Sequence, residues 1–267
     1  MSFSIEGKTA IVTGAANGVG LAIARHFIDQ GANVMFADMD EARLCHECGD
    51  IPEEGGNMRY FAGDLRERLT LANLLSATID SFDRVDILIN GSRQVMASDP
   101  LDLDDHSFET LMMQNVTNTF RLSQMVAKRM IKQSAGKEDG QAGAIINLSS
   151  IAARRTQPQL LSYSVSTAAL DQLTRSLAVA FAQYRIRVNS VALGSVMSAS
   201  LKDALKQNGD YREEIEDNTP LKRIAAPGEL AEAVQFLASE GAGFVTGQIM
   251  TVDGGRTLLD PVGAPAH

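Results

Sequence analysis

The chain has 267 residues, 45% of them hydrophobic, and a formal net charge of −9 at pH 7. This length can bury the core of one α/β domain, so we expect a single domain spanning residues 1–267. A negative balance without a run of Lys and Arg argues against nucleic acid or an anionic membrane as partner, and no apolar run has the length of a membrane span. The first residues show no leader pattern, and we expect a cytoplasmic protein.

Apolar runs of strand length alternate with amphipathic runs of helix length over the first 90 residues. We expect strands in KTAIVTG, NVMFAD, NMRYFAGD and VDILIN, with helices between them. Strands that are rich in Val and Ile and lack a polar face are typical of a parallel sheet covered by helices on both sides. The alternation therefore predicts a doubly wound α/β fold.

Three more strands are expected after Asn90, in GAIINLSS, RIRVNSVA and QIMTVDGG. Long helices are predicted over residues 107–132 and 161–182, and a further helix in PGELAEAVQFLAS. Together with the first four strands, this predicts a Rossmann fold with a seven-stranded parallel sheet. We interpret residues 195–219 as a substrate lid, residues 134–143 as an exposed loop, and residues 260–267 as a loose tail.

Both cysteines of the chain, Cys45 and Cys48, lie in the stretch CHEC after the second predicted strand. They could form a redox or metal pair with His46, or they could be small apolar residues of a helix. A structural zinc site normally takes four ligands, and the sequence offers no second cysteine pair to complete one. We therefore predict no metal site.

A glycine-rich turn, TGAANGVG, joins the first predicted strand to the first helix. Glycines in such a turn let the backbone approach a pyrophosphate, and the helix amino terminus presents N–H groups to it. Asp38 ends the next strand, where a carboxylate can accept hydrogen bonds from an adenosine ribose and repels a 2′-phosphate. No Lys or Arg lies in the turn or directly after Asp38. We predict NAD as cofactor, with NADP less favoured; alternatively, Asp38 is a solvated strand end.

Two hydroxyl side chains follow at the carboxyl edge of the predicted sheet, where open α/β folds bind their ligands. Ser150 closes the strand GAIINLSS, and Tyr163 opens the stretch YSVST. Reduction of a carbonyl by hydride transfer needs a donor to the developing oxyanion and a source of a proton. The serine can supply the first and the tyrosine the second.

These motifs resemble the short-chain dehydrogenase/reductase family along nearly the whole chain. Thr13, Gly14, Gly18 and Gly20 match its T-G-x-x-x-G-x-G spacing, and Ser150 and Tyr163 match its catalytic Ser and Tyr. The resemblance implies an NAD(H)-dependent oxidoreductase that interconverts a secondary alcohol and a ketone, with Tyr163 as acid and base. It also implies a homotetramer or homodimer, formed through the two long helices and the last helix and strand. The resemblance further implies that Asn115 holds a water, and that Asp64 contacts adenine or else caps a helix. Other residues implied beside the cofactor are Asn17, Val19, Asn90, Gly91 and Gly194.

The sequence departs from the family pattern at three places around the expected nicotinamide. Thr167 stands where the family has a lysine that binds the ribose and favours the tyrosinate. The family's N-N-A-G is Asn90-Gly91-Ser92-Arg93 here, and its P-G is Leu193-Gly194. The cofactor's adenosine side is matched, whereas the side that carries the chemistry has changed.

Two hypotheses follow from these departures. One is an oxidoreductase of reduced activity, acting on a substrate such as an oxoacyl thioester, a hydroxysteroid or a sugar alcohol. The other is a non-catalytic NAD(H)-binding protein that serves as a sensor or partner subunit. Arg93, Arg154 and Arg155 lie in loops that should border the pocket, where each is either a replacement cation or an exposed arginine.

Overall fold

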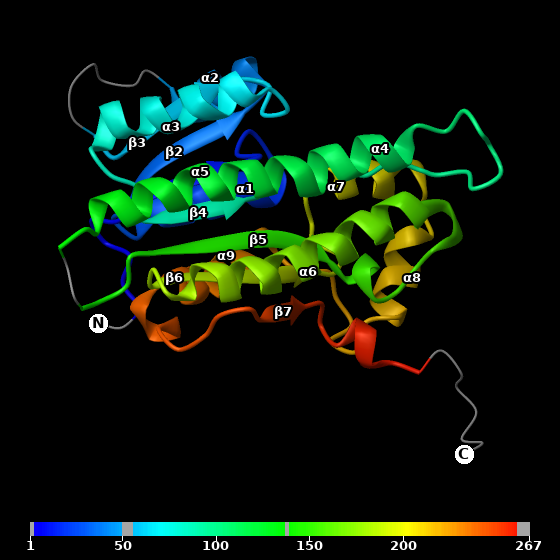
Figure 1. The fold of residues 1–267 in the computed structure, drawn as a ribbon. Coiled ribbons are helices and arrows are strands. Elements are labelled where there is room, and N and C mark those ends of the chain that lie inside the picture. Colours follow the sequence, from blue (N-terminus) through cyan, green and yellow to red (C-terminus); the bar gives the residue numbers. More distant parts are fainter. Residues whose placement is uncertain (1–2, 50–55, 137–138, 261–267) are drawn as a thin grey trace.

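A computed structural model describes the chain except residues 1–2, 50–55, 137–138 and 261–267 (Figure 1). Seven strands form one sheet in the order β3-β2-β1-β4-β5-β6-β7, and every neighbouring pair is parallel. The predicted seven-stranded parallel sheet is thereby confirmed. The strands are β1 (Thr9–Thr13), β2 (Asn33–Asp38), β3 (Met58–Ala62), β4 (Ile87–Asn90), β5 (Gly143–Ser150), β6 (Ile186–Leu193) and β7 (Ile249–Val252).

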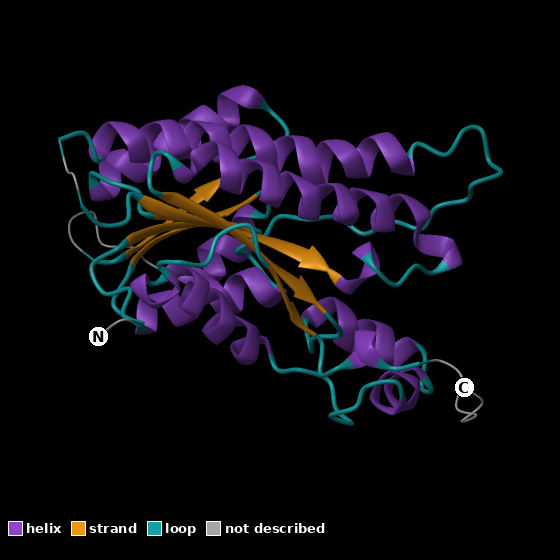
Figure 2. Ribbon diagram, turned by 60° about the horizontal axis from the view of Figure 1, so that its bottom comes forward, coloured by secondary structure: helices purple, strands orange, loops and turns teal. Residues whose placement is uncertain are grey.

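Helices cover both faces of this sheet, as Figure 2 shows. One apolar cluster joins the strands to α1 (Gly18–Asp29), α2 (Glu41–Cys48) and α9 (Pro227–Ala238). The other joins them to α3 (Arg68–Phe82), α5 (Asn118–Gln133) and α6 (Leu161–Ala182). In β1, Ala10 and Val12 belong to the first cluster and Ile11 to the second, because successive side chains of a strand point to opposite faces. Burial on both faces explains why these strands are apolar throughout.

The long helix predicted over residues 107–132 is divided into three parts. It starts as α4 (Ser107–Leu111), widens into a π-helical turn over Met112–Thr117, and continues as α5. A π turn inside a helix contains one extra residue per turn, and such turns are frequent at functional sites. Asn115 lies within this turn and is buried.

The predicted lid, residues 195–219, contains two helices. These are α7 (Ala199–Gln207) and α8 (Tyr211–Asp217), which lie beyond the carboxyl ends of the strands in Figure 1. An isolated parallel bridge joins Val196, near the start of the segment, to Ala225, which lies beyond its end. In the loop predicted over 134–143, Gly143 is already the first residue of β5. Of the predicted tail, only Asp260 is among the described residues.

The CHEC stretch lies on α2, with Cys45 exposed and Cys48 buried. Burial is the largest cause that raises the pKa of the Cys48 thiol, to about 11. Within the described part of the chain, no group of three or more His, Cys, Asp and Glu side chains could hold a metal ion. Nor is any helix there long and apolar enough to cross a membrane.

The turns that follow β1 and β4 touch each other through their backbones. Gly14 has a φ of +70°, and a Cβ atom on it would lie 2.8 Å from the Gly91 carbonyl oxygen. A Cβ atom on Gly91 would lie 2.5 Å from the Thr13 carbonyl oxygen. The Thr13 hydroxyl accepts hydrogen bonds from the Gly91 N–H at 3.0 Å and the Ser92 N–H at 3.1 Å. This contact fixes the start of the loop after β4.

Replacing Gly91 by Ala should therefore destabilise the protein by about 1–3 kcal/mol, because the new methyl group meets a backbone oxygen that cannot turn away. Denaturant unfolding measures the change. The control is Gly228→Ala on α9, where nothing lies within 4 Å of the added Cβ. That variant should be neutral or more stable by about 0.5–1 kcal/mol. Equal stability of the two variants would contradict the close contact.

Candidate active site

The two predicted catalytic hydroxyls lie at the carboxyl edge of the sheet. Ser150 is the last residue of β5 and is 9% exposed, while Tyr163 is the third residue of α6 and is 5% exposed. The Tyr163 ring packs with Leu111 and Ala152 in a small apolar cluster. The Ser150 hydroxyl accepts a hydrogen bond from the Ala152 N–H at 3.1 Å, which leaves its own O–H able to donate.

The side chain of Asn115 is bonded to the loop after β4. Its Oδ1 accepts from the Gln94 N–H at 2.9 Å, and its Nδ2 donates to the Gln94 carbonyl at 3.0 Å and to the Ser166 hydroxyl at 3.2 Å. The two bonds to Gln94 hold both polar groups of one backbone residue. The amide therefore positions this loop, and a bound water at Asn115 stays a prediction.

Thr167, predicted at the family's lysine position, is 3% exposed and directs its hydroxyl back to its own helix. Its Oγ1 donates to the carbonyls of Tyr163 at 2.9 Å and Ser164 at 3.1 Å. Threonine in a helix commonly bonds the carbonyl one turn earlier in this way. The hydroxyl is thus used within α6.

The three candidate arginines form hydrogen bonds with different parts of the chain. Arg93 donates from Nη1 to the Tyr163 hydroxyl at 3.3 Å and to the Ser149 carbonyl at 3.4 Å. Arg154 instead donates to the Thr251 hydroxyl at 3.1 Å, and Arg155 donates to the Thr257 carbonyl. Of the three, only Arg93 contacts a predicted catalytic group.

The Asn90 amide is buried beneath the site rather than turned toward it. Its Nδ2 donates to Asn147 Oδ1 at 2.8 Å and to the Ser123 hydroxyl at 3.1 Å, and Asn147 Nδ2 donates to the Thr174 hydroxyl at 2.8 Å. These bonds link β4 and β5 to α5 and α6. These side-chain bonds do not involve a cofactor, so a contact between Asn90 and a cofactor stays a prediction.

The glycine-rich turn and the start of α1 have the features of an anion site. Asn17 precedes the helix without a side-chain capping bond, so the first N–H groups of the helix are not capped by it. Gly18 has a φ of +58°, whereas Val19 and Gly20 are buried where α1 starts. This arrangement fits a pyrophosphate on the helix amino terminus.

Asp38, at the end of β2, is tied to that turn. One carboxylate oxygen accepts from the Ala16 N–H at 3.1 Å and the other from the Asp40 N–H at 3.2 Å. Asp64, after β3, receives a two-pronged hydrogen bond from Arg66, which is the largest cause that lowers the pKa of its carboxyl. Gly194 follows β6 and donates from its N–H to the Val252 carbonyl at 3.0 Å.

Several residues near the site were not singled out from the sequence. Ser198 caps α7, and its Cβ lies 3.6 Å from where a Cβ on Gly18 would be, so the predicted lid starts beside the glycine-rich turn. A serine just before a helical pattern is a capping signal that could have placed the helix start. Gln94 and Ser166 have no such signal, because their role depends on contact with Asn115.

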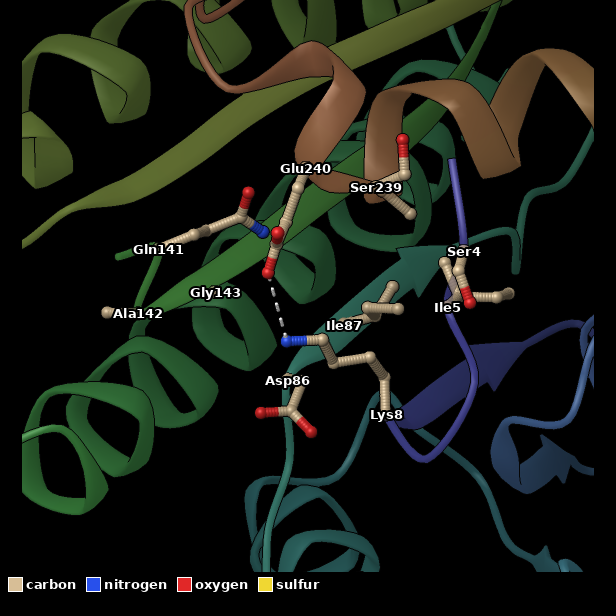
Figure 3. A pocket seen from close by; sticks show the side chains of 11 residues that line it. Ser4, Ile5, Lys8, Asp86, Ile87, Gln141, Ala142, Gly143, Ser239 and Glu240 are labelled. Carbon is tan, nitrogen blue, oxygen red and sulfur yellow. Dashed lines mark ion pairs between the residues drawn. The ribbon is translucent and has the colours of Figure 1, made fainter. Parts of the chain in front are cut away.

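A separate small cavity opens at the opposite, amino-terminal edge of the sheet (Figure 3). Lys8 and Glu240 face each other across it, with 3.8 Å between Nζ and Oε1. Ile87 and Gly143, which begin β4 and β5, also line it. Ser150 ends the strand that Gly143 begins, so this cavity is distinct from the candidate active site.

Comparisons with known proteins show which family the chain belongs to. A family model described as "Enoyl-(Acyl carrier protein) reductase" matches residues 14–257. The 7alpha-hydroxysteroid dehydrogenase of Escherichia coli (strain K12) is 32% identical over 251 residues, which cover 94% of each chain. The galactitol 2-dehydrogenase (L-tagatose-forming) of Cereibacter sphaeroides is 33% identical over 258 residues, 96% of this chain and 97% of that one. The chain belongs to the short-chain dehydrogenase/reductase family.

A solved structure of a short-chain dehydrogenase/reductase extends the likeness to three dimensions. It is a 7 alpha-hydroxysteroid dehydrogenase complexed with NADH and 7-oxo glycochenodeoxycholic acid, with a TM-score of 0.85 and 33% identity. The match covers 95% of this chain and 96% of that chain. The family relatives named above are dehydrogenases that act on alcohols.

In this short-chain dehydrogenase/reductase an acidic side chain is buried on the helix that carries Tyr163. Asp171 is 4% exposed, and burial raises the pKa of its carboxyl against the opposing effects of Ser149, Arg154 and Arg175. The folded chain therefore holds this proton more tightly than the unfolded chain does. The contribution of this proton to the free energy of unfolding is fully present below the ordinary carboxyl pKa. It is lost as the pH rises through the raised pKa of the folded chain.

Replacing Asp171 by Asn should accordingly raise the free energy of unfolding, relative to the native chain, at about pH 8. The difference should shrink toward about pH 3, below the ordinary carboxyl pKa, where this carboxyl is mostly protonated in both the folded and the unfolded chain. Urea unfolding over a pH series measures it, and Glu232→Gln, an exposed change on α9, gives the effect of net charge alone. A difference that does not vary with pH would contradict the buried charge.

Proposed function

We propose that this chain is an NAD(H)-dependent oxidoreductase that interconverts a secondary alcohol and a ketone. The observation that carries the proposal is the buried Tyr163 hydroxyl at the carboxyl edge of the sheet, next to the strand end with Ser150 and in contact with a guanidinium. The family relatives support an oxidoreductase, because they are dehydrogenases of alcohols.

Each side chain then has a distinct role in the reaction. The Ser150 O–H donates a hydrogen bond to the substrate oxygen, which stabilises the negative charge that develops there on reduction. Tyr163 gives its proton to that oxygen on reduction and takes the proton back on oxidation. A bound nicotinamide would supply or accept the hydride.

The choice of NAD rests on the charges around the adenosine end. Asp38 presents a carboxylate there, and a carboxylate repels a 2′-phosphate. Two arginines nearby in sequence are already paired with acids. Arg43 Nε lies 3.3 Å from Asp40 Oδ2, and Arg66 Nη2 lies 2.5 Å from Asp64 Oδ2.

The second candidate function is NAD(H) binding without catalysis. It is favoured by Thr167, whose hydroxyl serves its own helix and leaves α6 without a cation at this position. In that case the glycine-rich turn and Asp38 would keep their roles, whereas Tyr163 would be only a buried aromatic residue. The two functions differ in turnover and agree in cofactor binding.

Substrate choice and assembly belong to the same proposal. Residues 195–219, with α7 and α8, act as the substrate lid, since they lie beyond the strand ends and begin beside Gly18. The chain assembles as a homotetramer or homodimer through its long helices. Exposed apolar side chains on α5 and α6, among them Phe120, Val165 and Val179, support this arrangement.

NADH oxidation with a panel of ketones, together with calorimetry of NADH binding, tests the function. The native chain should turn over at least one ketone. Tyr163→Phe should lower kcat at least about a hundredfold, because it removes the proton donor, and should bind NADH as before. Binding of NADH without turnover of any ketone would support the second candidate and contradict the first.

Replacing Asp38 by Asn should test the choice of cofactor. The amide keeps the size of the side chain and removes the charge, so the affinity for NADPH should rise about tenfold, or ~1.4 kcal/mol, while that for NADH changes less. Calorimetric titration with both cofactors measures the ratio. Equal binding of NADH and NADPH by the native chain would refute the preference.

A further inference from the structure

We infer that Arg93 supplies the positive charge that Thr167 cannot, so that Tyr163 is assisted by a guanidinium from the loop after β4 instead of an ammonium from α6. This inference rests on the proposed function, in which Tyr163 transfers a proton. It gives a catalytic role to a residue at which the family pattern has a small one.

The contact between the two side chains is the first support. Arg93 Nη1 lies 3.3 Å from the Tyr163 hydroxyl and 3.4 Å from the Ser149 carbonyl, so it bridges the start of α6 and the end of β5. Among the described residues, no salt bridge includes Arg93. Its charge is therefore not neutralised by a neighbour before it acts on the tyrosine.

The backbone around Arg93 is held on both sides. Upstream, the Ser92 N–H donates to the Thr13 hydroxyl at 3.1 Å; downstream, Asn115 bonds both the N–H and the carbonyl of Gln94. The Ser92 hydroxyl also accepts from Gln114 Nε2 at 3.1 Å. A long side chain on a loop held in this way starts from a fixed position, which reduces the entropy lost when it contacts Tyr163.

Other described groups do not take this role. Arg154 and Arg155 bond Thr251 and Thr257, and the Thr167 hydroxyl bonds its own helix. Asp171, which lies beside Ser149, is an acid, and Arg175, which acts on Asp171, donates to the Gln172 side chain. Arg93 is thus the cation that the structure brings to the tyrosine.

A guanidinium differs chemically from the amine that it replaces. It stays protonated throughout the physiological range, so it favours the tyrosinate by charge and does not pass a proton itself. Its five N–H donors also exceed what the two bonds from Nη1 require, which leaves donors for an oxygen of cofactor or substrate. The Arg93 residue as a whole is exposed, and solvent screening limits the effect to a moderate one.

The test combines Arg93→Ala with Thr167→Lys in a double-mutant cycle on the holoenzyme. Arg93→Ala should lower kcat for alcohol oxidation at least about tenfold, or ~1.4 kcal/mol, and Arg93→Lys should retain part of the rate. Thr167→Lys should restore most of the loss in the Arg93→Ala background and add much less to the native chain, since both cations act on one hydroxyl. Arg154→Ala, in the next loop, is the matched control and should stay within about threefold of native.

Two outcomes of this cycle would overturn the inference. Unchanged or faster turnover by Arg93→Ala, with equal or tighter NADH binding, would show a bystander or an obstruction of the cofactor site. Additive effects of the two substitutions would show that they act on different groups.

A second measurement separates this inference from the proposed function. The free energy of unfolding is measured without substrate for Arg93→Ala, Tyr163→Phe and the double variant. The two changes should be non-additive, because each removes the same contact between the guanidinium and the hydroxyl. If no ketone is turned over and the changes are still non-additive, the proposed function fails and the contact stands. If the changes are additive, the role of Arg93 is refuted whatever the turnover.

Discussion

The backbone contact between the turns after β1 and β4 is the constraint on which the site depends. Gly14 and Gly91 approach so closely that neither position has room for a Cβ, and the Thr13 hydroxyl joins the two turns. The glycine-rich turn lies on one side of this contact and the Arg93 loop on the other. The region expected to receive a pyrophosphate and the region proposed to carry the chemistry thus meet at one backbone contact between the turns that follow two adjacent parallel strands.

Buried polar side chains hold the floor of the site. Asn90, Asn147 and Thr174 form a chain of amide and hydroxyl bonds that crosses from β4 through β5 to α6. An unsatisfied polar group in such a position would be costly, whereas a satisfied network fixes one arrangement of its elements. Tyr163 and Thr174 lie on the same helix, so the network also sets where the tyrosine stands relative to Ser150.

Sequence reasoning recovered the sheet because its evidence is local: each strand is a short apolar run that must be buried on both faces. Glycine spacing likewise located the turn before α1. The π turn around Asn115, the hydroxyl of Thr167 bonded to its own helix and the direction of Arg93 could not be read in this way. Each depends on which side chains from distant segments come into contact. The sequence did not distinguish Arg93, Arg154 and Arg155 as candidate cations, whereas their hydrogen-bond partners in the structure do.

The origin of the Arg93 side chain in a loop has a consequence for heat resistance. A cation carried by α6 would move only with a helix packed against the sheet. Arg93 instead depends on bonds that Thr13 and Asn115 make to the connection between β4 and α4. Connections of this kind open at lower free-energy cost than core helices do. On warming, the assembled site would loosen while the seven strands remain paired. Activity would then be lost at a lower temperature than the one at which the sheet unfolds. The interval between these two temperatures would measure how strongly the connection between β4 and α4 is held.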